Sequence, residues 1–193
     1  MITSDNPIAL LSRALDQTGD IVARVRPGQA ALPTPCRSWD VRALVNHLVD
    51  EVDQFAKVTG GGERKHLGID VIGDDWAGAY RAAADSLLTA WRRPGALDRT
   101  QKLPFGEVPA AWTVGQQITE LVIHAWDIAK ATGQPTDLDP ELGQLALDWV
   151  NDNIKPEFRR DEATGGHIGP EVSVPAGAPL YDRIAAVGGR DPN

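Results

Sequence analysis

The sequence is poor in cysteine, in positive charge and in long apolar runs, and each shortage excludes a class of protein. Cys36 is the one cysteine, so no disulfide can form within the chain. Lysine and arginine total 19 against 27 acidic residues, and the formal net charge of −8 repels the phosphate backbone of a nucleic acid. No apolar run approaches the roughly 18 residues of a membrane span, and no basic stretch followed by an apolar core begins the chain. We therefore expect a cytoplasmic protein without nucleic-acid or membrane partners.

Apolar residues recur at helical spacing over most of the chain, which predicts an all-α fold in one domain of 193 residues. Polar residues mark where the helices begin. Ser38 is expected to cap the second helix, Thr113 and Gln116 to form a capping box for the fourth, and Asp139 to cap the fifth. The five predicted helices cover residues 6–26, 39–58, 76–91, 113–132 and 139–154.

Glycine and proline interrupt the helical pattern in two regions. A Pro-Phe-Gly turn within residues 97–108 predicts a short hairpin. Residues 159–193 predict an irregular, mostly extended tail with one short helical turn near residues 181–187. The expected organisation is a helical bundle over residues 1–155 and a C-terminal tail, residues 156–193, that packs on the same domain.

The second predicted helix carries two ionisable side chains near its apolar face. At 100° per residue, His47 falls at the edge of the apolar arc and Glu51 nearer its middle. A single histidine in such a position is more often a core-edge residue that donates to a backbone carbonyl. His47 alone therefore does not indicate a functional site.

The fourth predicted helix is apolar nearly all round, so it is expected to be buried. Glu120 and His124 are four residues apart and Asp127 follows three later, which places all three on one face. An unpaired buried carboxylate is costly, so Glu120 needs a cation, a proton or water. A structural Glu–His or His–Asp pair and a metal site both satisfy this need. The addition of His47 from another core-lined helix favours the metal.

Two imidazoles and one carboxylate suit a borderline divalent ion and leave a coordination position open for water or substrate. Zinc is the first choice for His47, Glu120 and His124, with nickel, iron or manganese as alternatives. Asp127 is expected to orient an imidazole or to pair with an arginine rather than to bind the ion, and Glu51 is a further candidate for this supporting role.

Three segments resemble a known family. Residues 33–50 read PTPCRSWDVRALVNHLVD, residues 119–135 read TELVIHAWDIAKATGQP, and residues 179–192 read PLYDRIAAVGGRDP. They resemble actinobacterial metal-binding proteins of the mycothiol-dependent maleylpyruvate isomerase type, within the DinB-like superfamily. The resemblance implies a DinB-like four-helix bundle, often dimeric, whose metal ligands are the histidine of the NHLV segment and the E-x-x-x-H pair. These ligands fall on His47, Glu120 and His124, in agreement with the interpretation from the residues.

The resemblance also bears on the reaction. The isomerase itself carries an additional C-terminal domain, whereas only a short tail follows the fifth helix here, so maleylpyruvate is not the expected substrate. The leading hypothesis is an enzyme whose open metal position binds a low-molecular-weight thiol such as mycothiol, for transfer to or isomerisation of a small organic substrate. The alternatives are a metal-water hydrolase, with Asp127 or Glu51 assisting proton transfer, and a metal-binding or ligand-sensing module without turnover.

Overall fold

The structure is a computed structural model that describes residues 6–65, 68–103, 106–161 and 168–193. The described part is mainly helical, with one antiparallel hairpin, which confirms the predicted all-α class. Residues 104 and 105 of the predicted turn lie outside the described residues, but strands flank them as expected. The elements are α1 (Pro7–Ala23), α2 (Val41–Thr59), α3 (Trp76–Trp91), β1 (Thr100–Leu103), β2 (Gly106–Pro109), α4 (Ala110–Thr132), α5 (Pro140–Asn153) and α6 (Leu180–Val187).

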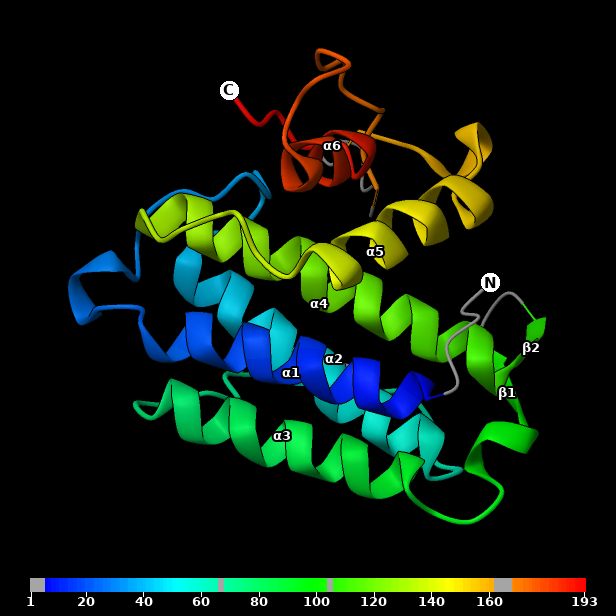
Figure 1. Ribbon diagram of the computed structural model, residues 1–193. Helices are drawn as coiled ribbons and strands as arrows, with labels where there is room; N and C mark the ends of the chain where they lie inside the picture. Colours follow the sequence, from blue (N-terminus) through cyan, green and yellow to red (C-terminus); the bar gives the residue numbers. More distant parts are fainter. Residues whose placement is uncertain (1–5, 66–67, 104–105, 162–167) are drawn as a thin grey trace.

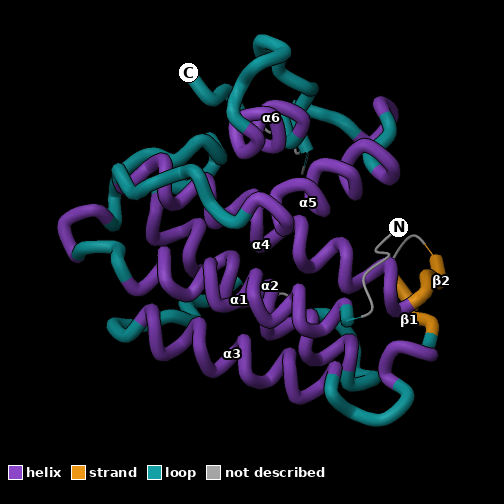
Figure 2. Tube along the Cα trace, viewed as in Figure 1, coloured by secondary structure: helices purple, strands orange, loops and turns teal. Residues whose placement is uncertain are grey.

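The first four helices form the DinB-like four-helix bundle. Helices α1 and α2 each pack against both α3 and α4. Helix α5 covers α4 on the side away from α3, and α6 packs on α5 and α4 at the top of the view in Figure 1. Loops make up most of the described residues between α5 and α6 (Figure 2). None of the described helices has both the length and the apolar character needed to cross a bilayer.

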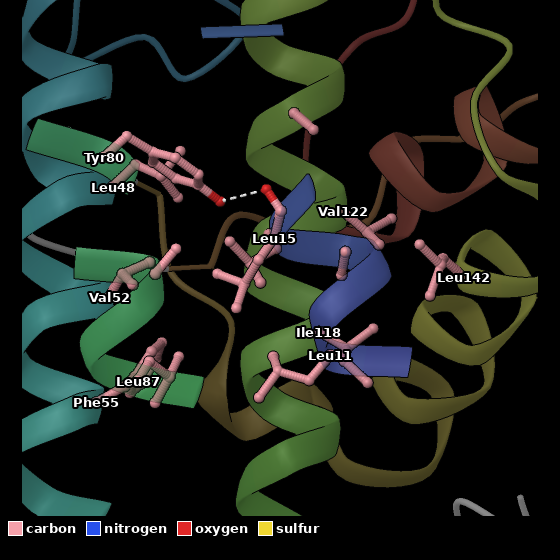
Figure 3. Packing of buried hydrophobic residues seen from close by; sticks show 14 of the residues in the cluster. Leu11, Leu15, Leu48, Val52, Phe55, Tyr80, Leu87, Ile118, Val122 and Leu142 are labelled. Carbon is pink, nitrogen blue, oxygen red and sulfur yellow. Dashed lines mark hydrogen bonds between the residues drawn. The ribbon is translucent and has the colours of Figure 1, made fainter. Parts of the chain in front are cut away.

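The core lies between the bundle helices and continues beneath α5. Figure 3 shows leucine, valine and aromatic side chains of α1, α2, α3 and α4 in mutual contact, with Leu142 of α5 packed at the edge. Tyr80 of α3 brings a hydroxyl into this core and donates it to the carbonyl oxygen of Leu15 at 3.1 Å. Burial raises the pKa of Tyr80 well above its usual range. The buried Tyr80 hydroxyl is therefore satisfied by a hydrogen bond from α3 to α1.

Two of the predicted helix starts are wrong. Asp40 rather than Ser38 caps α2, because its side chain accepts a hydrogen bond from the backbone N–H of Ala43. Helix α4 begins at Ala110, three residues before the expected capping box, and the hydroxyl of Thr113 donates instead to the carbonyl of Ala110. The hairpin delivers the chain directly into α4 at Pro109, so no side-chain cap is formed there. The predicted cap of α5 by Asp139 is confirmed.

Candidate functional site

Helix α4 brings a carboxylate, an imidazole and a second carboxylate into one line. Atom Nδ1 of His124 lies 3.1 Å from Oδ2 of Asp127, and atom Nε2 of the same ring lies 3.4 Å from Oε2 of Glu120. An ionised carboxylate can only accept, so Nδ1 carries a proton and donates it to Asp127. This bond fixes the tautomer of the neutral ring. In the neutral ring, Nε2 carries the lone pair with which histidines bind metal ions, whereas in the protonated ring the Nε2–H group donates to Glu120.

The three groups shift one another's pKa. Partial desolvation raises the pKa of Glu120, but the hydrogen bond with His124 and the nearby positive charges outweigh this effect and lower the pKa to about 2. Burial lowers the pKa of His124, but its bonds to Asp127 and Glu120 raise it to about 9. The pKa of Asp127 falls because the charge of Arg190 and the bond from His124 exceed the effect of burial. Without an ion, the site holds an imidazolium between two carboxylates.

The expectation that Glu120 is buried needs correction. His124 and Asp127 are buried, whereas 40% of the Glu120 side chain remains accessible to solvent. The reason is that Glu120 lies on the edge of α4 that faces a pocket rather than the helical core. Its carboxylate therefore stays within reach of a ligand that enters from solvent.

Helix α2 and the segment before it add His47 and Trp39. The His47 ring lies edge-on to the His124 ring, with centroids 5.3 Å apart and an angle of 85° between the planes. Trp39 stacks on the His47 ring, with the two ring centroids 4.2 Å apart. The Asp40 cap fixes the start of α2, so the short segment that carries Trp39 is held over the ring. The two histidines predicted from separate helices are thus brought together.

Arg190 is a part of the site that the sequence reasoning missed. Its guanidinium lies 3.2 Å from Oδ2 of Asp127, and both side chains are buried. It also donates to the carbonyl of Gly188 at 2.6 Å and lies 3.6 Å from Sγ of Cys36. Asp127 therefore does both things expected of it as alternatives, since it orients His124 and pairs with an arginine. The arginine comes from the glycine-rich tail, where no periodicity marks it.

Glu51 lies in the same pocket, but its charge is directed to another partner. Its side chain is 11% exposed and forms a salt bridge with Arg64, which follows α2 in the chain. The Arg64 guanidinium also lies over the ring of Phe55, at 5.5 Å from the centroid. Glu51 is thus held by an ion pair at the pocket wall.

The site opens into a pocket of about 180 Å³. Its lining combines the charged and aromatic residues described above with apolar and small polar residues of α4, α5 and the tail. The lining residues are Cys36, Ser38, Trp39, His47, Glu51, Arg64, Gln116, Thr119, Glu120, Ile123, His124, Trp149, Val150, Ile154, Ile168, Gly188 and Arg190.

The donor set can be tested against the geometry of a metal ion. Ligands bound at 2.0–2.2 Å to a tetrahedral zinc lie about 3.3 to 3.6 Å from each other. The separation of 3.4 Å between His124 Nε2 and Glu120 Oε2 falls in this range. Within the part of the chain that the structure describes, no three His, Cys, Asp or Glu side chains stand ready around one point. Two donors therefore fit an ion, and His47 would have to approach them to complete the set.

Similarity to known proteins extends over most of the chain. Residues 11–129 match the family model described as the mycothiol maleylpyruvate isomerase N-terminal domain, a range that contains His47, Glu120 and His124. Two uncharacterized proteins of Mycobacterium tuberculosis, one from each of two strains, are 35% identical over 96% of this chain and 98% of their own length.

Solved structures show the same fold. The crystal structure of the mycothiol-dependent maleylpyruvate isomerase superimposes with a TM-score of 0.65 at 14% identity, covering 86% of this chain and 73% of that one. A histidine-to-alanine variant of that isomerase gives a TM-score of 0.64. With more than half of the chain matched by the family model, the protein belongs to the family of the mycothiol maleylpyruvate isomerase N-terminal domain.

Proposed function

We propose that this chain is a metal-dependent enzyme in which a low-molecular-weight thiol, such as mycothiol, reacts with a small organic electrophile. His47, Glu120 and His124 would hold one divalent ion, with zinc as the first choice. The observation that carries the proposal is the line from Asp127 through His124 to Glu120, which ends in a pocket. The family and the mycothiol dependence in the name of the structurally similar isomerase support a thiol as the co-reactant.

A bound divalent ion would supply a positive charge that lowers the pKa of the thiol and favours its nucleophilic thiolate form. The chain's own residues support this in three ways. Asp127 holds the His124 ring with Nε2 toward the pocket. Trp39 holds the plane of His47 by stacking on it. Arg190 balances the buried charge of Asp127, so that carboxylate remains ionised beneath the site.

The reaction begins when the thiol loses its S–H proton and its sulfur forms a bond to the electrophilic carbon. In a transferase, the leaving group departs with the electron pair of its bond, and the thiol is consumed. In an isomerase, sulfur adds to a carbon–carbon double bond that is conjugated to a carbonyl group, and the π electron pair moves onto the carbonyl oxygen. The resulting single bond rotates, the electron pair returns to re-form the double bond, and the carbon–sulfur bond breaks to return the thiolate. Both reactions share the first step, so the same pocket serves either.

Metal analysis and cobalt spectroscopy test the proposal together. The purified protein is expected to carry close to one divalent ion per chain, and His47→Ala, Glu120→Gln and His124→Ala should each lower this content. The matched control is Glu141→Gln, which removes an exposed carboxylate of α5 that pairs with Arg13. In the cobalt-substituted protein, added mycothiol should shift the visible spectrum as a sulfur ligand replaces an oxygen ligand.

Three results would count against the proposal. A protein that is purified without metal and refuses zinc, cobalt and nickel at micromolar concentration lacks the site. A cobalt spectrum unchanged by thiol would favour the metal-water hydrolase or the module without turnover. Full metal content in all three variants would mean that other residues bind the ion.

A further inference from the structure

The pocket has an apolar part that the thiol chemistry does not use. The donor side chains come from α2 and α4. Apolar side chains come from α5, from the residue that follows its last turn, and from the tail. Trp149 and Val150 lie in the last turn of α5, Ile154 caps that helix, and Ile168 lies in the tail. Ile123 of α4 lies next to His124 in the sequence and joins the donors to this apolar part. A ligand that reaches the donors from this direction therefore lies against apolar side chains.

Both guanidinium groups of the pocket are already paired with carboxylates. Arg64 forms a salt bridge with Glu51, and Arg190 forms one with the buried Asp127. A cation that already has its carboxylate offers less attraction to a second anion, because the second carboxylate must lose water and is repelled by the first. Among the lining residues that the structure describes, no lysine and no further arginine is present. The described lining therefore offers only these two paired arginines where enzymes commonly use a guanidinium or ammonium group to bind a substrate carboxylate.

The charge of the working site leads to the same result. With a thiolate and a divalent ion bound as proposed, the carboxylates of Glu51, Glu120 and Asp127 and the thiolate would balance the charges of the two arginines and the ion. The site is then neutral overall when thiol and ion are bound. An anionic substrate would bring an uncompensated negative charge into a partly enclosed, largely apolar pocket, which is unfavourable. An uncharged substrate brings none and buries apolar surface.

We propose that the electrophile is uncharged and carries an apolar alkyl or aryl body, an inference that rests on the thiol-dependent function proposed above. Its body lies against α5 and the tail, and its reactive carbon lies toward His47 and His124. For an alkyl halide, the thiolate sulfur forms the new bond to carbon while the halide leaves with the electron pair of the broken bond. For an epoxide, the ring carbon–oxygen bond breaks and the oxygen takes up the proton that the thiol has lost.

A pair of electrophiles matched in size tests the charge preference. The metal-loaded protein and mycothiol are mixed with 4-methylbenzyl chloride or with 4-(chloromethyl)benzoate, and each rate is corrected for the reaction without protein. The expected kcat/KM is at least tenfold higher for the methyl compound. Equal values, or a preference for the carboxylate, would overturn the proposal.

Glu51→Gln makes the test specific to the arrangement of charges. The substitution keeps the shape of the side chain but removes the negative charge beside the Arg64 guanidinium, so the preference for the neutral compound should fall by about tenfold. Glu141→Gln is the matched control, because Glu141 is exposed and pairs with Arg13 away from the pocket. A preference that is identical in Glu51→Gln and in the control would contradict the assigned role of the ion pair.

A binding measurement separates this inference from the proposed function. The unreactive alcohols 4-methylbenzyl alcohol and 4-(hydroxymethyl)benzoate are titrated into the protein, and tryptophan fluorescence is followed, since Trp39 and Trp149 line the pocket. If neither chloride reacts but the neutral alcohol binds more tightly, the proposed function fails and the ligand preference stands. If the carboxylate binds as tightly as the neutral alcohol, or if neither binds, the ligand preference fails.

Discussion

His124 has a carboxylate at each ring nitrogen, and this makes the stability of the metal-free protein depend on pH. The two bonds raise its pKa from 6.5 to about 9. A raised pKa in the folded state stabilises the protein fully below pH 6.5, and this contribution disappears as the pH rises through 9. The difference between the two values corresponds to about 3 kcal/mol. We expect the free energy of unfolding of the metal-free protein to fall over this interval.

Urea unfolding with chelator at a series of pH values measures this effect. His124→Gln is the control, because it retains a polar side chain but has no proton to lose in this range. The variant should be less stable at neutral pH and should show a flatter pH dependence. A wild-type midpoint that stays constant from pH 6.5 to 9 would show that His124 is not charged between the two acids.

Asp127 binds two partners at once, so its amide should be a poor substitute. An asparagine oxygen cannot keep full bonds to both His124 and Arg190, and it leaves the buried guanidinium without a countercharge. We expect Asp127→Asn to lower metal affinity by about 10- to 100-fold. We also expect it to destabilise the protein by about 3 to 5 kcal/mol.

Competition with a chromogenic chelator gives the affinity, and urea midpoints give the stability. Asp85→Asn is the control, since Asp85 is an exposed residue of α3. Equal metal affinity in the two variants would show that Asp127 does not position His124. Complete loss of metal in Asp127→Asn would instead suggest that Asp127 is a ligand itself.

The candidate site was predictable from the sequence where helical spacing determines proximity. Glu120, His124 and Asp127 share one face of α4 because four and three residues are close to one turn. His47 was indicated by its position on another apolar helix. Arg190 could not be predicted in the same way, because 63 residues separate it from Asp127 and a tail without periodicity connects them. Its contact depends on how the tail folds over α4.

At the scale of the elements, local signals in the sequence predicted some helix boundaries correctly and missed others. Helix α3 begins and ends at Trp76 and Trp91 as predicted, because an Asp cap and a Pro-Gly pair bound an alanine-rich run. Helix α4 begins earlier than its capping box suggests. Here the preceding strand and Pro109 set the entry of the chain, and the tertiary connection overrides the local capping signal.

Gly189 determines how the tail presents Arg190. It has a φ of +84°, and a Cβ at this position would lie 2.7 Å from the Cα of Gly169. An alanine would therefore be strained in its backbone and would also push the two tail segments apart. We expect Gly189→Ala to destabilise the protein by about 1 to 3 kcal/mol. Because Arg190 follows directly, we also expect weaker metal binding.

Gly177→Ala is a matched control within the same tail. A Cβ there meets no atom within 4 Å, and the backbone is not in the left-handed region. Its urea midpoint and metal affinity should equal those of the wild type. If Gly189→Ala behaves like this control, the close approach of the two glycines does not hold Arg190 in place.

At the scale of the whole molecule, the tail is attached to the bundle at several separate points. Tyr181 of α6 donates to the carbonyl of Asp139, and Lys130 of α4 donates to the carbonyl of Pro192. The apolar side chain of Ile184 is buried in the core cluster that also contains Leu142 of α5. Together with the Arg190 pair, these contacts make the tail part of the core rather than a covering. We therefore predict that the bundle over residues 1–155 and the tail after it unfold together as one cooperative unit.

A chain that ends after residue 155 tests whether the tail belongs to this cooperative unit. Such a chain keeps α1 to α5 but leaves Asp127 buried without Arg190 and exposes the apolar surface that α6 covers. We expect it to unfold at a much lower urea concentration than the full chain, which should unfold in a single transition followed by circular dichroism and by tryptophan fluorescence. A chain that lacks only residues 191–193 keeps Arg190, loses only the Lys130–Pro192 contact among those named, and is the control for truncation itself.

The effect of Asp127→Asn in the shortened chain separates the two causes of its instability. In the full chain this substitution breaks a buried ion pair and is destabilising, but in the shortened chain it removes a buried carboxylate that has lost its arginine. We therefore expect the sign to reverse, with Asp127→Asn raising the urea midpoint of the shortened chain. If the substitution destabilises both chains equally, the tail does not act through Arg190. If the shortened chain has the midpoint of the full chain, the tail is not part of the cooperative unit.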